Sequence, residues 1–132
     1  MTYKDNKKRA LEDLKNYPYL KSSLITLHKR IELLKKLYPD ENSTTETTAV
    51  AEQINCLSRK LEINATQVSC IDQALSSLSE AEHKLINTYY IHRQRGVVEN
   101  LSANNFSDRS TLYRRAQKAL DHYIFAYFGE TK

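Results

Sequence analysis

Residues 44–78 carry apolar side chains at alternating steps of four and three, and this seam is what most constrains the fold. Such spacing is typical of helices that pack side by side, as in a coiled coil. Ser43 and Glu46 match a capping box, so the helix is expected to begin near residue 44 and to run to about residue 78. The seam consists of Val50, Ile54, Leu57, Leu61, Asn64, Val68, Ile71, Leu75 and Leu78.

A second seam with the same spacing lies in residues 18–38. Since only the polar residues 39–43 join the two segments, the helices are predicted to pair as an antiparallel hairpin. The second seam consists of Leu20, Leu24, Leu27, Ile31, Leu34 and Tyr38.

The hairpin leaves two questions open. Asn64 is the single polar member of the longer seam; it either fixes the register or oligomeric state, or marks a frayed or solvated point. The shorter helix also cannot cover the whole of the longer one. The seam around residues 68–78 must therefore face the N-terminal helix, the C-terminal region or a second chain, which makes a homo-oligomer or a partner protein on the hairpin an expectation.

A shorter N-terminal helix is expected over residues 4–16, with Ala10, Leu11 and Leu14 on one side. Tyr17-Pro18 is predicted to end it, because the residue before a proline is disfavoured in the α region. Pro18 is well suited to the first position of the next helix.

The C-terminal residues 79–132 are predicted to form three helices, the first of them started by a capping box at Ser79 and Glu82. The turns are expected at Gly96, at Asn104-Asn105 and at Gly129. The expected elements are a helix over residues 80–95, a short helix over residues 97–103, and a last helix from Ser107 or Asp108 to Phe128.

The whole chain is therefore predicted to be all-α. Its 132 residues include only 2 Gly and 2 Pro, and a sheet protein of that size needs many more turn residues. We expect an N-terminal helical hairpin with a heptad seam in residues 1–78, and a C-terminal domain of three helices in residues 79–132.

The last helix has one apolar side and one basic side. A helix of this kind can pack on a core with one side and enter a DNA groove with the other, although an ordinary solvated face is the alternative. The side expected to be buried consists of Leu112, Ala116, Ala119, Leu120, Tyr123, Ile124 and Tyr127.

The opposite side carries residue types that bind DNA. Arginine can bind guanine with two hydrogen bonds, glutamine can bind adenine, and hydroxyl groups bind bases or phosphates. The predicted DNA-contacting residues are Ser107, Asp108, Arg109, Ser110, Thr111, Tyr113, Arg114 and Gln117, with Arg93, Arg95, Arg115 and Lys118 expected at phosphates.

The distribution of charge is consistent with such a partner at the C-terminal end. Residues 1–36 hold ten basic and four acidic side chains, residues 37–82 hold two and eight, and residues 83–132 hold eight and four. The chain is thus basic at both ends and acidic in the middle, although a mixed solvated surface would account equally well for the N-terminal block.

Several short motifs carry a resemblance to a known family. They are Leu78-Ser79-Glu80-Ala81-Glu82, Ile86, Tyr89-Tyr90, Ser107 to Arg114, Lys118-Ala119-Leu120, and near the N-terminus Leu14 to Lys21. With these residues the chain resembles the helix-turn-helix of sigma-factor region 4 and, more closely, the small phage late-transcription regulators of the ArpU/RinA type. The resemblance implies binding to double-stranded DNA and control of transcription by RNA polymerase in a bacterial host cell. The chain departs from the usual pattern in residues 97–105, which lack a clear Ala-Gly pair.

The sequence gives little support to other kinds of chemistry. The four histidines form no His-x-x-x-His pair, and two glycines cannot build a glycine-rich phosphate loop, so no catalytic, cofactor or metal site is expected and the protein is not expected to be an enzyme. Cys56 and Cys70, fourteen residues apart on one predicted helix, cannot bridge each other. No apolar run reaches the length that a membrane requires, so a cytoplasmic protein is expected. The alternative function is a helical adaptor or anti-regulator that acts through the long hairpin.

Overall fold

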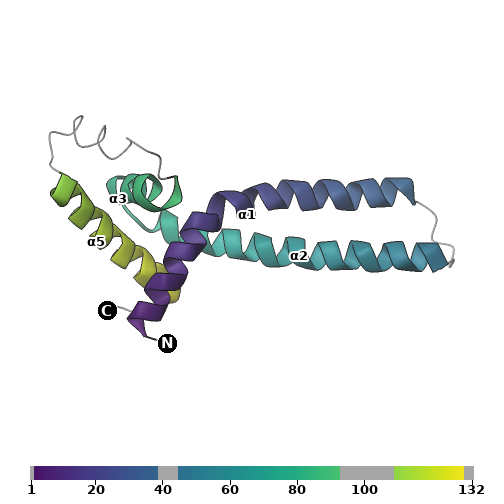
Figure 1. Cartoon of the computed structure of the whole chain (residues 1–132), viewed down its shortest axis with the longest axis horizontal. Coiled ribbons are helices and arrows are strands. Elements are labelled where there is room, and N and C mark those ends of the chain that lie inside the picture. Colours follow the sequence, from purple (N-terminus) through teal and green to yellow (C-terminus); the bar gives the residue numbers. More distant parts are fainter. Residues whose placement is uncertain (1, 39–44, 93–108, 130–132) are drawn as a thin grey trace. The chain divides into compact units, whose positions relative to one another are not determined.

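The structure, a computed structural model, is built from helices and describes residues 2–38, 45–92 and 109–129. No strand occurs among these residues, so the predicted all-α fold class is confirmed. The elements in chain order are the α-helices α1 (Tyr3–Leu37), α2 (Thr45–Ser76) and α3 (Glu80–Ile86), the π-helix η1 (Asn87–Ile91) and the α-helix α5 (Arg109–Phe128) (Figure 1).

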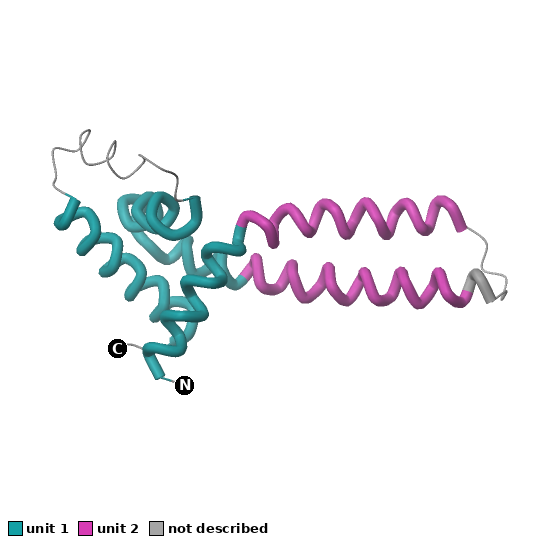
Figure 2. Tube along the Cα trace, in the orientation of Figure 1, with its two compact units in different colours: residues 1–17, 70–132 teal, residues 18–69 magenta. Residues whose placement is uncertain are grey.

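The contacts within the chain divide it into two compact units (Figure 2). Unit 1 comprises Met1–Tyr17 and Cys70–Lys132, and unit 2 comprises Pro18–Ser69. The helices α1 and α2 are each divided between the two units. The expected division into domains 1–78 and 79–132 stays a prediction.

Unit 2 is an antiparallel pair formed by the second part of α1 and the first part of α2 (Figure 2). The two helices meet through the seams that the sequence predicted, since every described seam residue of unit 2 except Tyr38, at the end of α1, is buried or half-buried. The centre of this core consists of Leu27, Ile31 and Leu57, with Leu34, Ile54 and Leu61 packed against them.

Asn64 bonds across this seam. Its side-chain amide donates a hydrogen bond to Oγ of Ser23 over 3.0 Å, and the Ser23 hydroxyl donates to the Leu20 carbonyl over 2.6 Å. Both side chains are half-buried. Because the bond forms only when residues 23 and 64 lie opposite each other, it favours the interpretation that Asn64 fixes the register of the hairpin.

Removing this bond is expected to cost a modest part of the stability. Asn64→Ala and Ser23→Ala should each lower the free energy of unfolding by about 1 kcal/mol, and the double variant should lose clearly less than the sum. Urea unfolding followed by circular dichroism measures the four-member cycle. Thr66→Ala is the control, because that exposed hydroxyl bonds only within its own helix, to the Glu62 carbonyl. Strictly additive losses would contradict a direct bond between the two side chains.

Pro18 lies inside α1, so the prediction that Tyr17-Pro18 separates two helices is wrong. An interior proline removes one backbone hydrogen bond and costs about 3 kcal/mol. Leu14 and Tyr17 are buried in the turn before the proline, and Leu20 and Leu24 are half-buried in the turns after it. Tertiary packing thus outweighs the local preference, and only the division into units falls at Pro18.

Unit 1 brings together both ends of the chain. Tyr3 of α1 donates a hydrogen bond from its hydroxyl to Asp121 of α5, and Tyr17 of α1 donates one to Asp72 of α2. Burial and the bond to Asp72 raise the pKa of Tyr17 to about 12. Tyr123 of α5 is fully buried; this burial, with the charge of nearby Asp13, raises the pKa of Tyr123 well above its usual value.

The core of unit 1 explains the part of the α2 seam that the hairpin does not cover. Ile71, Ala74 and Leu75 of α2 are buried in the same unit as the N-terminal part of α1 and as α5. The N-terminal part of α1 and the C-terminal region therefore belong to the same unit as this stretch of the seam. The other residues buried in unit 1 include Ala10, Leu14, Ile86, Tyr89, Leu112, Ala116, Ala119, Leu120, Tyr123 and Ile124.

The predicted capping box at the start of α3 is confirmed. The Glu82 amide donates to Oγ of Ser79, and the Ser79 amide donates to the Glu82 carboxylate, both over 3.2 Å. The helix expected over residues 80–95 ends earlier in the structure. α3 continues directly as the π-helix η1, and His92, the residue after η1, leaves the helical region with φ −118°. The amide of His92 bonds the Asn87 carbonyl, five residues back, which closes the wide last turn.

Candidate nucleic-acid interface

The helix α5 rests on the core of unit 1 with its apolar side, as the sequence predicted. All the expected residues of that side are buried except Tyr127, which is half-buried. The helix ends where glycine was expected to end it. Gly129 has φ +75°, and its amide bonds the Phe125 carbonyl over 2.8 Å.

The other side of α5 is basic and open to solvent. Arg114, Arg115 and Lys118 are exposed, and Tyr113 is 49% exposed. Ser110 is exposed as well, whereas Thr111 and Gln117 are half-buried. Along the first ten residues of the helix there are four basic side chains and no acidic one. This part of α5 therefore presents positive charge beside side chains that can donate and accept hydrogen bonds.

One of these basic residues, Arg109, lies in the first turn of α5. The N-terminus of a helix carries partial positive charge, which acidic side chains in the first turn normally offset. The first turn of α5 has none, and Arg109 stands there instead. Both the N-terminus of a helix and a basic side chain favour a bound anion such as a phosphate.

Aromatic packing holds the N-terminal half of α5 in place. Tyr89 of η1 packs with Leu112 and Ala116, and its ring centroid lies 6.3 Å from that of Tyr113. The Gln117 amide donates to the Tyr113 hydroxyl over 3.1 Å. Tyr113 is thus supported on two sides. The second N–H and the carbonyl oxygen of the Gln117 amide do not take part in this bond, and these are the two groups that a contact with adenine uses.

Arg109 and Asp121 mark the two ends of the basic side along α5. Arg109 lies seven residues, or two turns, before the buried Ala116, so it is on the apolar side of α5. It is nevertheless exposed to solvent, because it is the first residue of the helix. Asp121 is the first acidic residue along α5, and it accepts the bond from Tyr3. Arg114, Arg115 and Lys118 lie between these two residues on α5, and they are the described residues best placed to contact a nucleic acid.

The other predicted contacts lie outside the described residues. These are Arg93, Arg95, Ser107 and Asp108, together with the short helix over residues 97–103, the stop at Gly96 and the turn at Asn104-Asn105. The helix-turn-helix itself therefore stays a prediction, as do these four DNA contacts.

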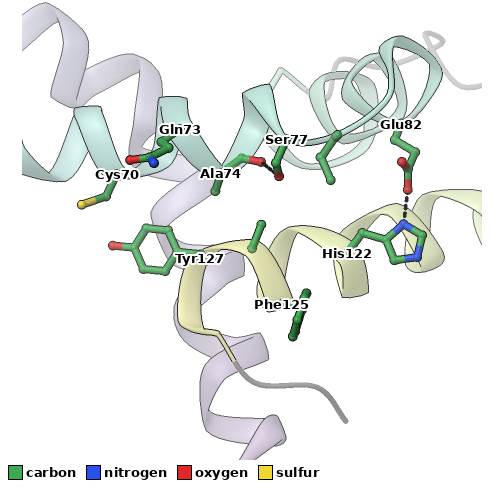
Figure 3. Close-up of a pocket in the computed structure, with 10 residues that line it drawn as sticks. Cys70, Gln73, Ala74, Ser77, Glu82, His122, Phe125 and Tyr127 are labelled. Atoms are coloured by element: carbon green, nitrogen blue, oxygen red, sulfur yellow. Dashed lines mark hydrogen bonds and ion pairs between the residues drawn. The ribbon is translucent and has the colours of Figure 1, made fainter.

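A groove that the sequence did not predict lies elsewhere in unit 1. It has a volume of about 690 Å³ and runs between the end of α2 and the C-terminal half of α5 (Figure 3). At one end the Glu82 carboxylate bonds Nδ1 of His122. At the other end lie Cys70 and Tyr127 (Figure 3). No local pattern signals this pair, because Glu82 and His122 are 40 residues apart in the chain.

The surroundings of Glu82 give the pair a pH dependence. Burial acts to raise the pKa of Glu82, but the bond with His122 and the two bonds with Ser79 outweigh it, and the pKa lies below its ordinary value. A carboxyl group with a lowered pKa stabilises the fold above pH ~4.5, and this contribution is lost as the pH falls through the folded-state pKa.

Glu82→Gln is expected to remove this pH dependence. The variant should lose about 0.5 kcal/mol at pH 7, because His122 is half exposed and the pair is partly screened. The difference from the unmodified protein should shrink as the pH falls below ~4.5 and should vanish once the pH lies below the lowered pKa of Glu82. Thermal unfolding between pH 3 and pH 7 measures this difference in stability. Glu80→Gln is the control, because Glu80 is an exposed residue of the same turn. A difference that stays constant over this range would contradict a charge effect.

Other kinds of site are not apparent in the part of the chain that the structure describes. No three His, Cys, Asp or Glu side chains among these residues are grouped so as to hold a metal ion. None of the described helices is both long and apolar enough to cross a membrane. Cys56 and Cys70 are exposed, and both lie on α2.

Comparison with known proteins adds no assignment to this geometry. The chain matches no protein-family model, no curated protein and no solved structure.

Proposed function

We propose that the protein is a sequence-specific DNA-binding regulator of transcription that places α5 in the major groove. The observation that carries the proposal is the basic, acid-free first half of α5, held by its apolar side on the core of unit 1. A helix with its side chains is about as wide as the major groove, so one rigid helix can present several side chains to base edges at once.

The side chains divide between two tasks in this proposal. Arg114 lies at the middle of the exposed side and serves as the base reader, because a guanidinium can bind guanine bidentately. Arg115 and Lys118 lie to one side of it and bind phosphates, which sets the register of the helix on the duplex. Tyr113, held against Tyr89 and Gln117, adds a rigid contact beside Arg114.

The biological setting follows from the resemblance of the chain to the ArpU/RinA-type regulators. It supports control of phage late genes, with RNA polymerase of the bacterial host as the enzyme that is regulated. In such a role the protein would bind close to a promoter and alter transcription from it, and unit 2 would be available to a partner protein.

A salt-dependent titration tests the proposal. Fluorescence anisotropy with duplexes from the DNA upstream of its own gene should find one sequence bound at least ~1000-fold more tightly than unrelated DNA. The logarithm of the affinity should fall linearly with that of the salt concentration. Arg115→Ala and Lys118→Ala should each reduce this slope by about one, with equal losses on all sequences.

Arg59→Ala is the matched control, because Arg59 is also exposed but lies on α2 in unit 2. It should leave both the affinity and the slope unchanged. Binding that ignores the DNA sequence, or slopes that do not change in the Arg115 and Lys118 variants, would overturn the proposal.

A further inference from the structure

One side of unit 2 exposes large apolar side chains next to the hairpin seam. Tyr19 is 74% exposed and Leu33 is 55% exposed, and these two residues are two heptads apart on α1. Ile63 of α2, one turn beyond Lys60, is 67% exposed. Single exposed apolar side chains are ordinary on a protein surface, so it is the grooves beside them that indicate an interaction site. We define the lateral face as Tyr19, Thr26, Arg30 and Leu33 of α1 with Cys56 and Lys60 of α2.

Two grooves run along the lateral face. The first, of about 490 Å³, is lined by Tyr19, Thr26 and Lys60 among others. The second, of about 320 Å³, is lined by Arg30, Leu33, Cys56 and again Lys60. The core residue Leu27 lines the first groove beside polar residues, and the core residues Leu34 and Leu57 line the second, so each groove has an apolar part. From residue 19 to residue 33 the lateral face is about 21 Å long, which is room for about four turns of a bound helix.

The charges on the lateral face have one sign. Arg30 and Lys60 are the charged residues that line the grooves, and neither groove has an acidic residue in its described lining. A second copy paired through the same face about a twofold axis would bring these cations together with no carboxylate between them. Like charges opposed across an interface disfavour that pairing, whereas a partner with carboxylates would complement it.

We propose that the lateral face binds an amphipathic helix of another protein, with apolar side chains in the two grooves and carboxylates opposite Arg30 and Lys60. A helix in a groove is a common mode of peptide recognition, with anchors at steps of three and four. The proposal does not depend on DNA binding, because α5 belongs to unit 1 and the lateral face to unit 2.

Selection from a displayed peptide library tests this inference on the full chain. The library consists of 20-residue helices with fixed leucines at steps of three and four and random polar positions. Selected peptides should be enriched in Asp and Glu beside the leucines. Their affinity, measured by anisotropy, should fall at least about tenfold in the Arg30→Glu/Lys60→Glu double variant.

Two further variants identify the surface. Leu33→Glu should abolish binding, because it places a charge in a groove wall. The double variant Lys21→Glu/Arg59→Glu makes the same change of charge at exposed residues that line neither groove, and it should bind the peptides as the unmodified chain does. Circular dichroism verifies that each variant keeps its helical content.

Three results would overturn the proposal. The first is a selection that yields no binder, or binders without acidic enrichment. The second is equal binding to the Arg30→Glu/Lys60→Glu variant. The third is a dimer in sedimentation equilibrium that Leu33→Glu dissociates, which would make a second copy the occupant of the lateral face.

Discussion

Replacing Arg114 with alanine is expected to weaken binding to the preferred DNA sequence by about 1–3 kcal/mol, or roughly 5- to 150-fold. The loss should be confined to that sequence, because a guanidinium that reads guanine contributes little to non-specific affinity. Anisotropy titrations with the preferred duplex, with duplexes substituted at single base pairs and with unrelated DNA measure the effect.

Arg114→Lys separates the two tasks that an arginine can have on DNA. Lysine keeps the charge but lacks the planar fork, so it replaces a phosphate contact well and a bidentate base contact poorly. Arg114→Lys should therefore lose most of what Arg114→Ala loses, whereas Arg115→Lys should bind nearly as well as the unmodified protein. Full recovery in Arg114→Lys would assign that residue to a phosphate and leave the base reader unidentified.

Replacing Leu14 with alanine is expected to lower the free energy of unfolding by about 2–5 kcal/mol. Leu14 is fully buried in unit 1, and a leucine cut to alanine in a packed core loses transfer free energy and leaves a cavity. The DNA affinity of the variant should also fall at temperatures where the variant is partly unfolded, because α5 is part of the same core. Urea unfolding at 25 °C measures the loss.

Lys15→Ala is the matched control for this variant, since Lys15 is the next residue on α1 and is exposed. Its stability should differ from that of the unmodified protein by no more than about 0.5 kcal/mol. A Leu14→Ala protein as stable as the control would show that the N-terminal part of α1 contributes little to the core, and would favour independent folding of residues 79–132.

The hairpin seams and the apolar side of α5 could be predicted because they depend only on periodicity along one helix. Leu27, Leu57 and Ala116 are buried for the same reason, which is that residues three and four apart share a side of a helix. The capping box at Ser79 is equally local, since its two hydrogen bonds join residues three apart. Each of these features is present in a short stretch of sequence.

Pairings between distant segments could not be predicted in this way. Periodicity shows that Leu14 and Tyr123 each lie on an apolar side, but it does not show that these sides share one core. The length of the helix through Pro18 was missed for a related reason, because the packing that outweighs the proline comes from other helices. In the candidate site the exposure of Arg114 followed from helix geometry, whereas the support that Tyr89 gives to Tyr113 depends on a contact between helices.

The hydrogen bond between Tyr3 and Asp121 joins residues 118 positions apart, and this separation has a consequence for synthesis on the ribosome. The hairpin of unit 2 is contiguous in sequence, so it can form while the chain is still being made. Unit 1 needs its first and last segments together, and it can close only after translation has reached the end of α5. A chain cut short by a nonsense codon before α5 would contain the hairpin of unit 2 but would lack part of the core of unit 1.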